Sequence, residues 1–275
     1  MDKYLESIKN NELPIITFRS FEKFDGVTHG FTTRLGGVSK GIFSSMNLSF
    51  QRGDYYEDVM KNFEIIADYI GYPVNKFVAS HQTHTTNIRV VTENDCGKGI
   101  IFERDYEDID GLVTNVPGIV LFTFYADCVP LYFFDEKNRV IALAHSGWKG
   151  TVGKIGKVMV GKMCAEFGSR PDDIFCAIGP SICQNCYEVS GDVAEEFMRN
   201  FTENEWKSFI KDGRPGKYQL NLWEANRKIF LEAGILEAHI ENREICTCCN
   251  KEILFSHRGL NGKRGNLAAF MALDR

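Results

Sequence analysis

Residues 118–150 read GIVLFTFYADCVPLYFFDEKNRVIALAHSGWKG, and this stretch decides the fold. Three segments within it, 118–125, 131–134 and 140–144, are rich in aromatic and β-branched residues, which favour strands. Their apolar residues stand at consecutive rather than alternate positions, so both faces of these strands should be covered. The stretch therefore predicts layered sheets with helices outside them.

The flanking sequence adds further strands and several helices. Strands are predicted over residues 77–80, 85–92 and 174–178, and helices over 55–70, 151–167, 193–201 and 221–234. The first helix should begin with a capping box, Asp54 with Glu57, and stop at Gly71, and the last should be capped by Asn221 with Glu224. Regular alternation of strand and helix is missing from residues 77 to 145. We therefore expect an α+β fold with mixed sheets and outer helices, in one domain spanning residues 1–275.

Composition excludes several classes of protein. The 275 residues are 44% hydrophobic and 25% charged, as in an ordinary globular protein, and the net charge is −5. Nucleic acids and anionic membranes call for clustered Lys and Arg, so neither is an expected partner. The first residues do not resemble a signal peptide and no apolar run is long enough for a membrane helix, so we expect a cytoplasmic protein. Nine cysteines then indicate thiols rather than a disulfide framework.

Three short segments offer ligands for a metal ion. They are His81-Gln82-Thr83-His84, Ala126-Asp127-Cys128-Val129-Pro130 and residues 144–150 (AHSGWKG), which contain His145. Two imidazoles and one thiolate form a known catalytic zinc set, in which the fourth position stays free for water or substrate. Each residue alone has a simpler interpretation, as a hydrogen-bonded histidine or a buried thiol. Together, at the starts and ends of predicted strands, they favour a metal-dependent enzyme.

The two histidines of the first segment cannot both serve if that segment is extended. His81 and His84 are three residues apart, which places them on opposite faces of a strand. The β-branched residues from Thr83 to Val91 favour a strand here, so only one of the two histidines should face a given site.

Other segments leave alternatives open. Cys183 and Cys186, together with Cys246, Cys248 and Cys249, resemble a four-thiolate structural zinc site. We interpret the second group, Cys246-x-Cys248-Cys249, as lacking the C-x-x-C spacing of a knuckle. A glycine-rich loop over residues 32–39 carries Arg34, which either binds an anion or is exposed beside a turn. Asp127 is either a general base or a cap for the next turn.

Several motifs together resemble the YfiH-type family, whose members have been called laccase-domain polyphenol oxidases, peptidoglycan editing factors and purine nucleoside phosphorylases. The motifs are Gln82-Thr83-His84, residues 123–130 (TFYADCVP), 144–151 (AHSGWKGT) and 178–182 (IGPSI), with further similarity at residues 32–34, 46–49, 220–223, 226–227, 255–258 and 268–270. The resemblance implies metal ligands at His84, Cys128 and His145, and substrate-binding residues at Arg34 and Asn47. It also implies a compact fold related to the catalytic domain of cytotoxic necrotising factor. Asn221, His257 and Asn266 depart from the family pattern, which leaves the substrate open.

The resemblance implies a zinc-dependent enzyme that cleaves adenosine, inosine, guanosine or methylthioadenosine with phosphate and deaminates adenosine. Asp127, Cys128 and His145 are then the expected catalytic residues, with Asp127 handling protons and Arg34 holding phosphate. Purine nucleosides and phosphate are the expected partners, and the chain is expected to be a monomer or a weak homo-oligomer.

Two alternatives use the same residues. One is a Cys128–His145 hydrolase or amidase that edits peptidoglycan precursors. The other is a copper-dependent polyphenol oxidase, and copper is a possible metal. A laccase needs several coppers and about ten histidines, whereas this chain has six.

Overall fold

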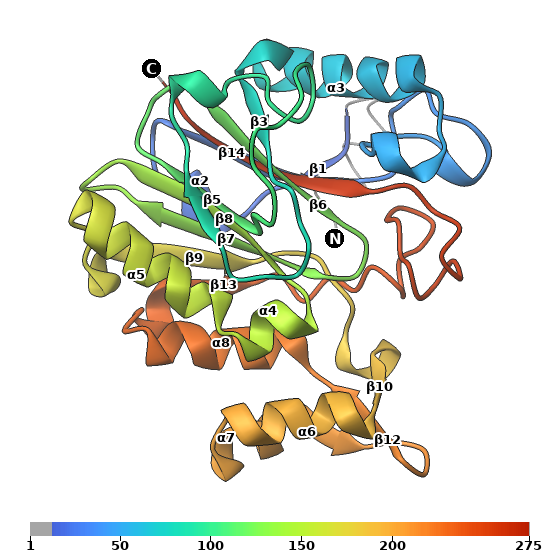
Figure 1. The fold of residues 1–275 in the computed structure, drawn as a ribbon, viewed down its shortest axis with the longest axis vertical. Helices are drawn as coiled ribbons and strands as arrows, with labels where there is room; N and C mark the ends of the chain where they lie inside the picture. The colour runs from blue at the N-terminus through green and yellow to red at the C-terminus, as the bar shows by residue number, and fades with distance from the viewer. Residues whose placement is uncertain (1–12, 275) are drawn as a thin grey trace.

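The computed structural model describes residues 13–274, and its framework is two β-sheets stacked face to face with helices on both outer faces (Figure 1). The first sheet has five strands, in the spatial order β1 (Ile15–Ile16), β2 (Val27–Thr32), β14 (Leu267–Leu273), β6 (Val120–Tyr125) and β3 (Phe77–Ala79). The second has six, in the order β13 (Ile240–Asn242), β9 (Ile174–Ile178), β7 (Val129–Asp135), β8 (Val140–Ser146), β5 (Gly111–Thr114) and β4 (Ile88–Val90). Three pairs are parallel, β3 with β6, β9 with β13 and β4 with β5, and the remaining pairs are antiparallel.

Helices cover the outer face of each sheet. α3 (Tyr56–Ile70) packs on the five-stranded sheet, where Phe63 meets Phe122. α4 (Trp148–Val152), α5 (Ile155–Phe167) and α8 (Leu222–Glu232) lie on the six-stranded sheet (Figure 1). The short helix α2 (Arg19–Glu22) buries Phe21 in the core between the two sheets.

A smaller lobe lies beyond α8, at the lower end of Figure 1. It contains α6 (Gly191–Asn200), α7 (Glu203–Phe209) and a three-stranded antiparallel sheet in the order β10 (Glu188–Ser190), β12 (Lys217–Leu220) and β11 (Ile210–Asp212). Phe197 and Phe209 of this lobe belong to the same apolar core as the six-stranded sheet. The lobe is therefore packed onto the main body.

The consecutive apolar residues of β7 fill two cores. Leu131 and Phe133 face the core shared with α5 and α8, whereas Tyr132 and Phe134 face the core between the two sheets. All seven residues of β7 and of β8 are buried. A strand covered on both faces needs an unbroken apolar run, which is the pattern the sequence carries.

The fold class inferred from the sequence, α+β with mixed sheets and outer helices, is confirmed. The strand predicted over 174–178 has the same bounds as β9, and the strands predicted within 118–144 correspond to β6, β7 and β8. The helix predicted over 55–70 is α3, which stops at Gly71 with a φ of 75°. Asn221 caps α8 as predicted, by accepting from the Glu224 N–H at 3.2 Å, but the other half of the capping box is not formed because the Glu224 carboxylate accepts from Arg227.

Three local predictions were wrong. The strand predicted over 85–92 is reduced to Ile88–Val90. The helix predicted over 151–167 is broken after α4, because Lys154 adopts a φ of 55° and a side chain at Gly153 would lie 2.7 Å from Thr86 Cγ2. Asp54 is not a helix cap, since its carboxylate accepts from the Tyr55 N–H and from the amide of Asn47.

Candidate functional site

His84, Cys128 and His145 come together where the loop after β3 meets the ends of β6, β7 and β8. Their ligand atoms all lie within 4.8 Å of one another, and the distance from His84 Nε2 to Cys128 Sγ is 4.0 Å. Pro130 of β7 pairs with His145 of β8, so the register of this hairpin sets Cys128 close to the imidazole. Of the three side chains, His145 is buried, Cys128 is half-buried and His84 is exposed. The cluster can therefore be reached from solvent on the His84 side.

Unusual backbone conformations lie beside two of the three side chains. His84 has a φ of 68° and Asp127, which precedes Cys128, has a φ of 88°. Non-glycine residues adopt this left-handed region at a cost of about 1–3 kcal/mol, and such residues gather at functional sites. The surrounding hydrogen bonds must therefore hold both loops in place.

Asp110, which sequence reasoning missed, holds the His84 loop and His145 together. Its Oδ1 accepts from His145 Nδ1 at 2.7 Å and from the His84 N–H at 3.1 Å. Its Oδ2 accepts from the N–H groups of Thr83 and Thr85 at 3.1 and 2.8 Å, and from the Thr85 hydroxyl at 3.0 Å. Because Nδ1 of His145 donates to this carboxylate, Nε2 is left to bind a metal, the usual arrangement behind a metal-binding histidine.

Burial and neighbouring charges shift the pKa values of the buried pair. Burial raises the pKa of the Cys128 thiol, but His145 and His84 lower it by more, to about 6. Burial lowers the pKa of His145, but Cys128 and Asp110 raise it by more, to about 9. Burial also raises the pKa of Asp110, but hydrogen bonds from His145 and the backbone bring it below its ordinary value. Cys128 is therefore poised to be a thiolate, the form that binds metals.

Gly147 has no side chain, and the cluster occupies the space that a side chain would fill. A β-carbon at this position would lie 2.8 Å from His84 Cδ2 and 3.1 Å from Cys128 Sγ. These separations are shorter than van der Waals contact, so a side chain here would push into two of the three candidate ligands. This close approach explains why glycine follows His145-Ser146 in the sequence.

The cluster forms one end of a cavity of about 370 Å³, within the size range of small-molecule sites, about 300–1,000 Å³. Three arginines line the cavity, Arg52, Arg104 and Arg264, and among the described residues none of them forms an ion pair with a carboxylate. Burial and, to a smaller extent, the nearby Arg52 lower the pKa of Arg264 to about 10, and Nε of Arg264 is buried without a hydrogen-bond partner. Three positive charges with no ion-paired carboxylate among the described residues make this wall suited to an anion.

His81 and His84 both line the cavity, so the argument that only one of them faces a site was wrong. The reason is that residues 80–87 form a loop containing only an isolated bridge between His81 and Ile109, so strand alternation does not apply. The backbone N–H of Asp108 donates to Nδ1 of His81 at 3.2 Å. The neutral imidazole therefore carries its proton on Nε2.

Asp127 lies next to Cys128 in sequence, but its carboxylate is occupied elsewhere. Oδ1 accepts from the Thr247 hydroxyl at 2.6 Å, and Oδ2 accepts from the Arg258 N–H at 2.7 Å. Asp127 is not among the residues that line the cavity. Among the described lining residues there is also no other Asp or Glu.

Arg34 and Asn47 lie outside the cavity lining as well. Arg34 donates to the carbonyl oxygens of Ser44 and Lys251 at 2.8 and 2.9 Å, and its guanidinium stacks 4.6 Å from the Phe255 ring. Asn47 is fully buried, and its Oδ1 accepts from the N–H groups of Ser49 and Asn266. Asn47 therefore ties together two segments of the cavity wall, at Ser49 and Asn266, whereas the partners of Arg34 do not line the cavity.

The departures from the family pattern occupy different places. Asn266 lines the cavity beside Arg264, so it belongs to the binding surface. Asn221 caps α8, and neither Asn221 nor His257, whose pKa is lowered by burial, lines the cavity. Among the described helices, none is long and apolar enough to cross a lipid bilayer.

Comparisons with known proteins identify the family. The profile of the family described as multi-copper polyphenol oxidoreductase laccase matches residues 28–274. Purine nucleoside phosphorylase YlmD of Geobacillus stearothermophilus is 38% identical over 249 residues, 90% of each chain. Adenosine deaminase RL5 from an unknown prokaryotic organism is 34% identical, covering 87% of this chain and 92% of that protein. The crystal structure of Bacillus licheniformis hypothetical protein YfiH is similar with a TM-score of 0.87 and 36% identity, covering 90% of this chain and 93% of that one.

The sequence relatives and the solved structure agree with the resemblance drawn from the motifs around His84, Cys128 and His145. The profile match and the sequence identities cover nearly the whole chain, including every segment that forms the cavity. The chain therefore belongs to the multi-copper polyphenol oxidoreductase laccase family, the YfiH-type family.

Proposed function

We propose that this protein is a zinc-dependent enzyme acting on purine nucleosides, which cleaves the glycosidic bond with phosphate and deaminates adenosine. One observation carries the proposal: the His84–Cys128–His145 cluster opens into a cavity with an arginine-lined wall. Relatives named as a purine nucleoside phosphorylase and an adenosine deaminase support it.

The three side chains fit a zinc ion. Zn–S and Zn–N bond lengths with tetrahedral angles imply a sulfur-to-nitrogen distance of about 3.6 Å. The 4.0 Å between Cys128 Sγ and His84 Nε2 is close enough for a small rotation of the exposed histidine to reach it. A zinc ion held by three protein ligands would supply a Lewis acid with one open coordination position.

In phosphorolysis, the bond between ribose C1′ and the purine nitrogen breaks while a phosphate oxygen bonds to C1′. Arg52, Arg104 and Arg264 would hold the phosphate, since their charges have no carboxylate partners among the described residues. The departing purine needs a proton or a hydrogen-bond donor. Nε2–H of His81 is the donor we assign to that role, because Asp108 holds the opposite ring nitrogen.

Deamination in the same cavity requires a water molecule to react at the purine ring rather than phosphate at the ribose. A water adds to the purine carbon that carries the amino group, and ammonia leaves after proton transfer. One proton of the water passes to the departing amino group, and Nε2–H of His81 donates a hydrogen bond to the purine ring. Since the Asp127 oxygens already accept from Thr247 and Arg258, we give Asp127 a positioning role.

Product analysis tests the proposal. Zinc-loaded protein is incubated with adenosine, with and without phosphate, and the products are separated by chromatography. We expect adenine and ribose 1-phosphate only with phosphate, and inosine in both samples, with hypoxanthine formed from the inosine where phosphate is present. His84→Ala should abolish both reactions, whereas untouched adenosine in every sample would refute the proposal.

A second candidate function is favoured by the lowered pKa of Cys128 beside His145. In protein without metal, this pair would be a thiolate next to an imidazolium, which is the arrangement of cysteine hydrolases and amidases. Activity that increases when the metal is chelated, on an amide such as a peptidoglycan precursor, would favour this function over the first.

The copper oxidase alternative has less support. All six histidines lie within residues 13–274, and of these only His84 and His145 join a cluster of metal-ligating side chains in the described part of the chain. That number is too small for the several coppers of a laccase.

A further inference from the structure

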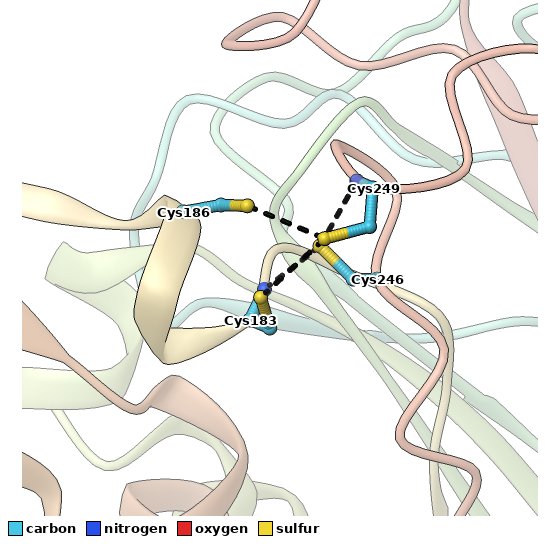
Figure 2. Close-up of side chains that lie close together, drawn as sticks. All are labelled: Cys183, Cys186, Cys246 and Cys249. Carbon is cyan, nitrogen blue, oxygen red and sulfur yellow. Dashed lines mark hydrogen bonds between the residues drawn. The ribbon is translucent and has the colours of Figure 1, made fainter.

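Four cysteines that play no part in the cavity converge from two loops. Cys183 and Cys186 follow β9, and Cys246 and Cys249 follow β13. Figure 2 shows the four side chains pointing toward one another from these two segments. The parallel pairing of β9 with β13 continues into the loops, where Ser181 bridges Cys246. The topology therefore brings the two pairs together, although they are about sixty residues apart in sequence.

The sulfur positions fit a single tetrahedral ion. Cys249 Sγ lies 3.5 Å from Cys186 Sγ and 4.0 Å from Cys183 Sγ, and all four sulfurs are within 4.8 Å of one another. A Zn–S bond length of about 2.3 Å with tetrahedral angles gives sulfur pairs about 3.8 Å apart. A disulfide requires about 2.05 Å, and all four cysteines are free thiols.

Two backbone N–H groups donate to one of the four sulfurs. The N–H groups of Cys183 and Cys249 both point at Cys246 Sγ, at 3.3 and 3.4 Å. Donors of this kind stabilise negative charge on a metal-bound sulfur and fix its orientation. Four buried neutral thiols would not need N–H donors directed at a sulfur, whereas a metal-bound thiolate accepts them.

The prediction that the second group of cysteines lacks C-x-x-C spacing was wrong. Cys246 and Cys249 are three residues apart, so both pairs have C-x-x-C spacing once Cys248 is set aside. Cys248 instead lies toward Gly259, where an added β-carbon would be 3.3 Å from its sulfur. The spacing therefore matches the two knuckles of a structural zinc site.

We propose that Cys183, Cys186, Cys246 and Cys249 bind one zinc ion in a closed, structural site, separate from the His84–Cys128–His145 cluster. Four thiolates leave no coordination position for substrate, in contrast to the three-ligand cluster. Soft thiolate ligands in tetrahedral geometry select zinc over magnesium, calcium and manganese.

This zinc site would hold the segments that support Asp127. The Ser181 N–H donates to the Ile245 carbonyl and the Thr247 N–H donates to the Ser181 carbonyl, both at 3.1 Å. Beside them, the Ile182 N–H donates to the Asp127 carbonyl at 3.0 Å, and the Thr247 hydroxyl donates to its carboxylate. Asp127 precedes Cys128, so the four-cysteine site lies behind the loop that presents a ligand of the catalytic cluster.

Metal stoichiometry tests the inference. The full-length protein is purified under reducing conditions, supplied with zinc, freed of excess by gel filtration, and measured by elemental analysis and native mass spectrometry. We expect two zinc ions per chain in the wild type and one in Cys249→Ser, chosen because Cys249 is the exposed member of the cluster. Cys248→Ser, the matched control, should keep two.

A second variant separates this inference from the proposed function. His84→Ala should lose the other ion and keep the one bound by the four cysteines. Cobalt loaded into His84→Ala should then show the visible absorption bands of tetrahedral cobalt with four thiolate ligands, and Cys186→Ser in the same background should remove them.

Two results would overturn the four-cysteine site. One is equal zinc content in the wild type, Cys248→Ser and a folded Cys249→Ser, with circular dichroism showing that the variant is folded. The other is a Cys186–Cys249 disulfide found by peptide mapping of the freshly reduced and zinc-loaded protein.

Discussion

Asp110→Asn tests whether the buried carboxylate organises the metal cluster. The change keeps the shape of the side chain and replaces one oxygen with an NH₂ group. Oδ1 accepts from two donors and Oδ2 from three, so in either orientation the new NH₂ faces at least two N–H or O–H groups. Each buried donor left unpaired costs about 1–3 kcal/mol, so the free energy of unfolding should fall by about 2–6 kcal/mol.

The substitution should also weaken metal binding. If the NH₂ group faces His145, the imidazole keeps its proton on Nε2 in order to accept at Nδ1, and Nε2 can then no longer bind a metal. Loss of such a hydrogen-bond partner behind a metal ligand typically lowers affinity by about 10–100-fold. Zinc affinity is measured by competition with a chromophoric chelator, and stability by thermal unfolding with and without zinc.

Asp108→Asn is the matched control for this experiment. Asp108 is exposed two residues away, has a φ of 53° that asparagine tolerates, and accepts from the Thr83 hydroxyl. It should change neither zinc affinity nor melting temperature appreciably. If Asp110→Asn binds zinc as tightly as the wild type and melts at the same temperature, the role assigned to Asp110 is wrong.

Three further predictions concern the same cavity. Gly147→Ala should lower zinc affinity because its methyl group contacts His84 and Cys128, whereas Gly161→Ala, with open space around it, should bind zinc like the wild type in the same competition assay. Arg104→Ala should raise the KM for phosphate about tenfold or more, which is the effect of losing one charged hydrogen bond, and should leave deamination nearly unchanged. The control, Arg34→Ala, should lower the melting temperature without affecting the KM for phosphate. In chelated protein, alkylation of Cys128 by iodoacetamide should increase as the pH rises through about 6, since the lowered pKa gives a thiolate above that pH, and zinc should protect it. A midpoint near the usual pKa of a thiol in mass-spectrometric labelling would contradict the last prediction.

Hydrophobic patterns in the sequence predicted the strands whose apolar residues reflect burial on both faces. β6, β7 and β8 could be found because their apolar runs are long and both of their faces are buried. β14 was missed since Leu267–Leu273 contains three alanines, and its strand conformation depends on pairing with both β2 and β6. In such a segment, pairing with strands distant in the sequence determines the conformation, and the local periodicity of apolar residues does not predict that pairing.

In the candidate site, too, some residues could be predicted from local sequence and others depend on tertiary contacts. His84, Cys128 and His145 stand in recognisable motifs, so sequence could propose them together. Asp110 is 35 residues from His145 in sequence, and its only local signal is its position just before the short strand β5. The cavity arginines, Arg52, Arg104 and Arg264, come from three segments far apart in the sequence, and no motif joins them.

The position of β14 has a consequence for how the chain folds during synthesis. This strand lies between β2 and β6, although it is the last strand in the chain among the described residues. While the ribosome makes the preceding residues, β2 and β6 have no partner along those edges, and the core between the sheets is open on one side. Pairings of such long sequence separation form slowly, and unpaired apolar edges invite aggregation. The five-stranded sheet can close only after residues 267–273 emerge, so the edges of β2 and β6 stay open to pairing with other chains until then.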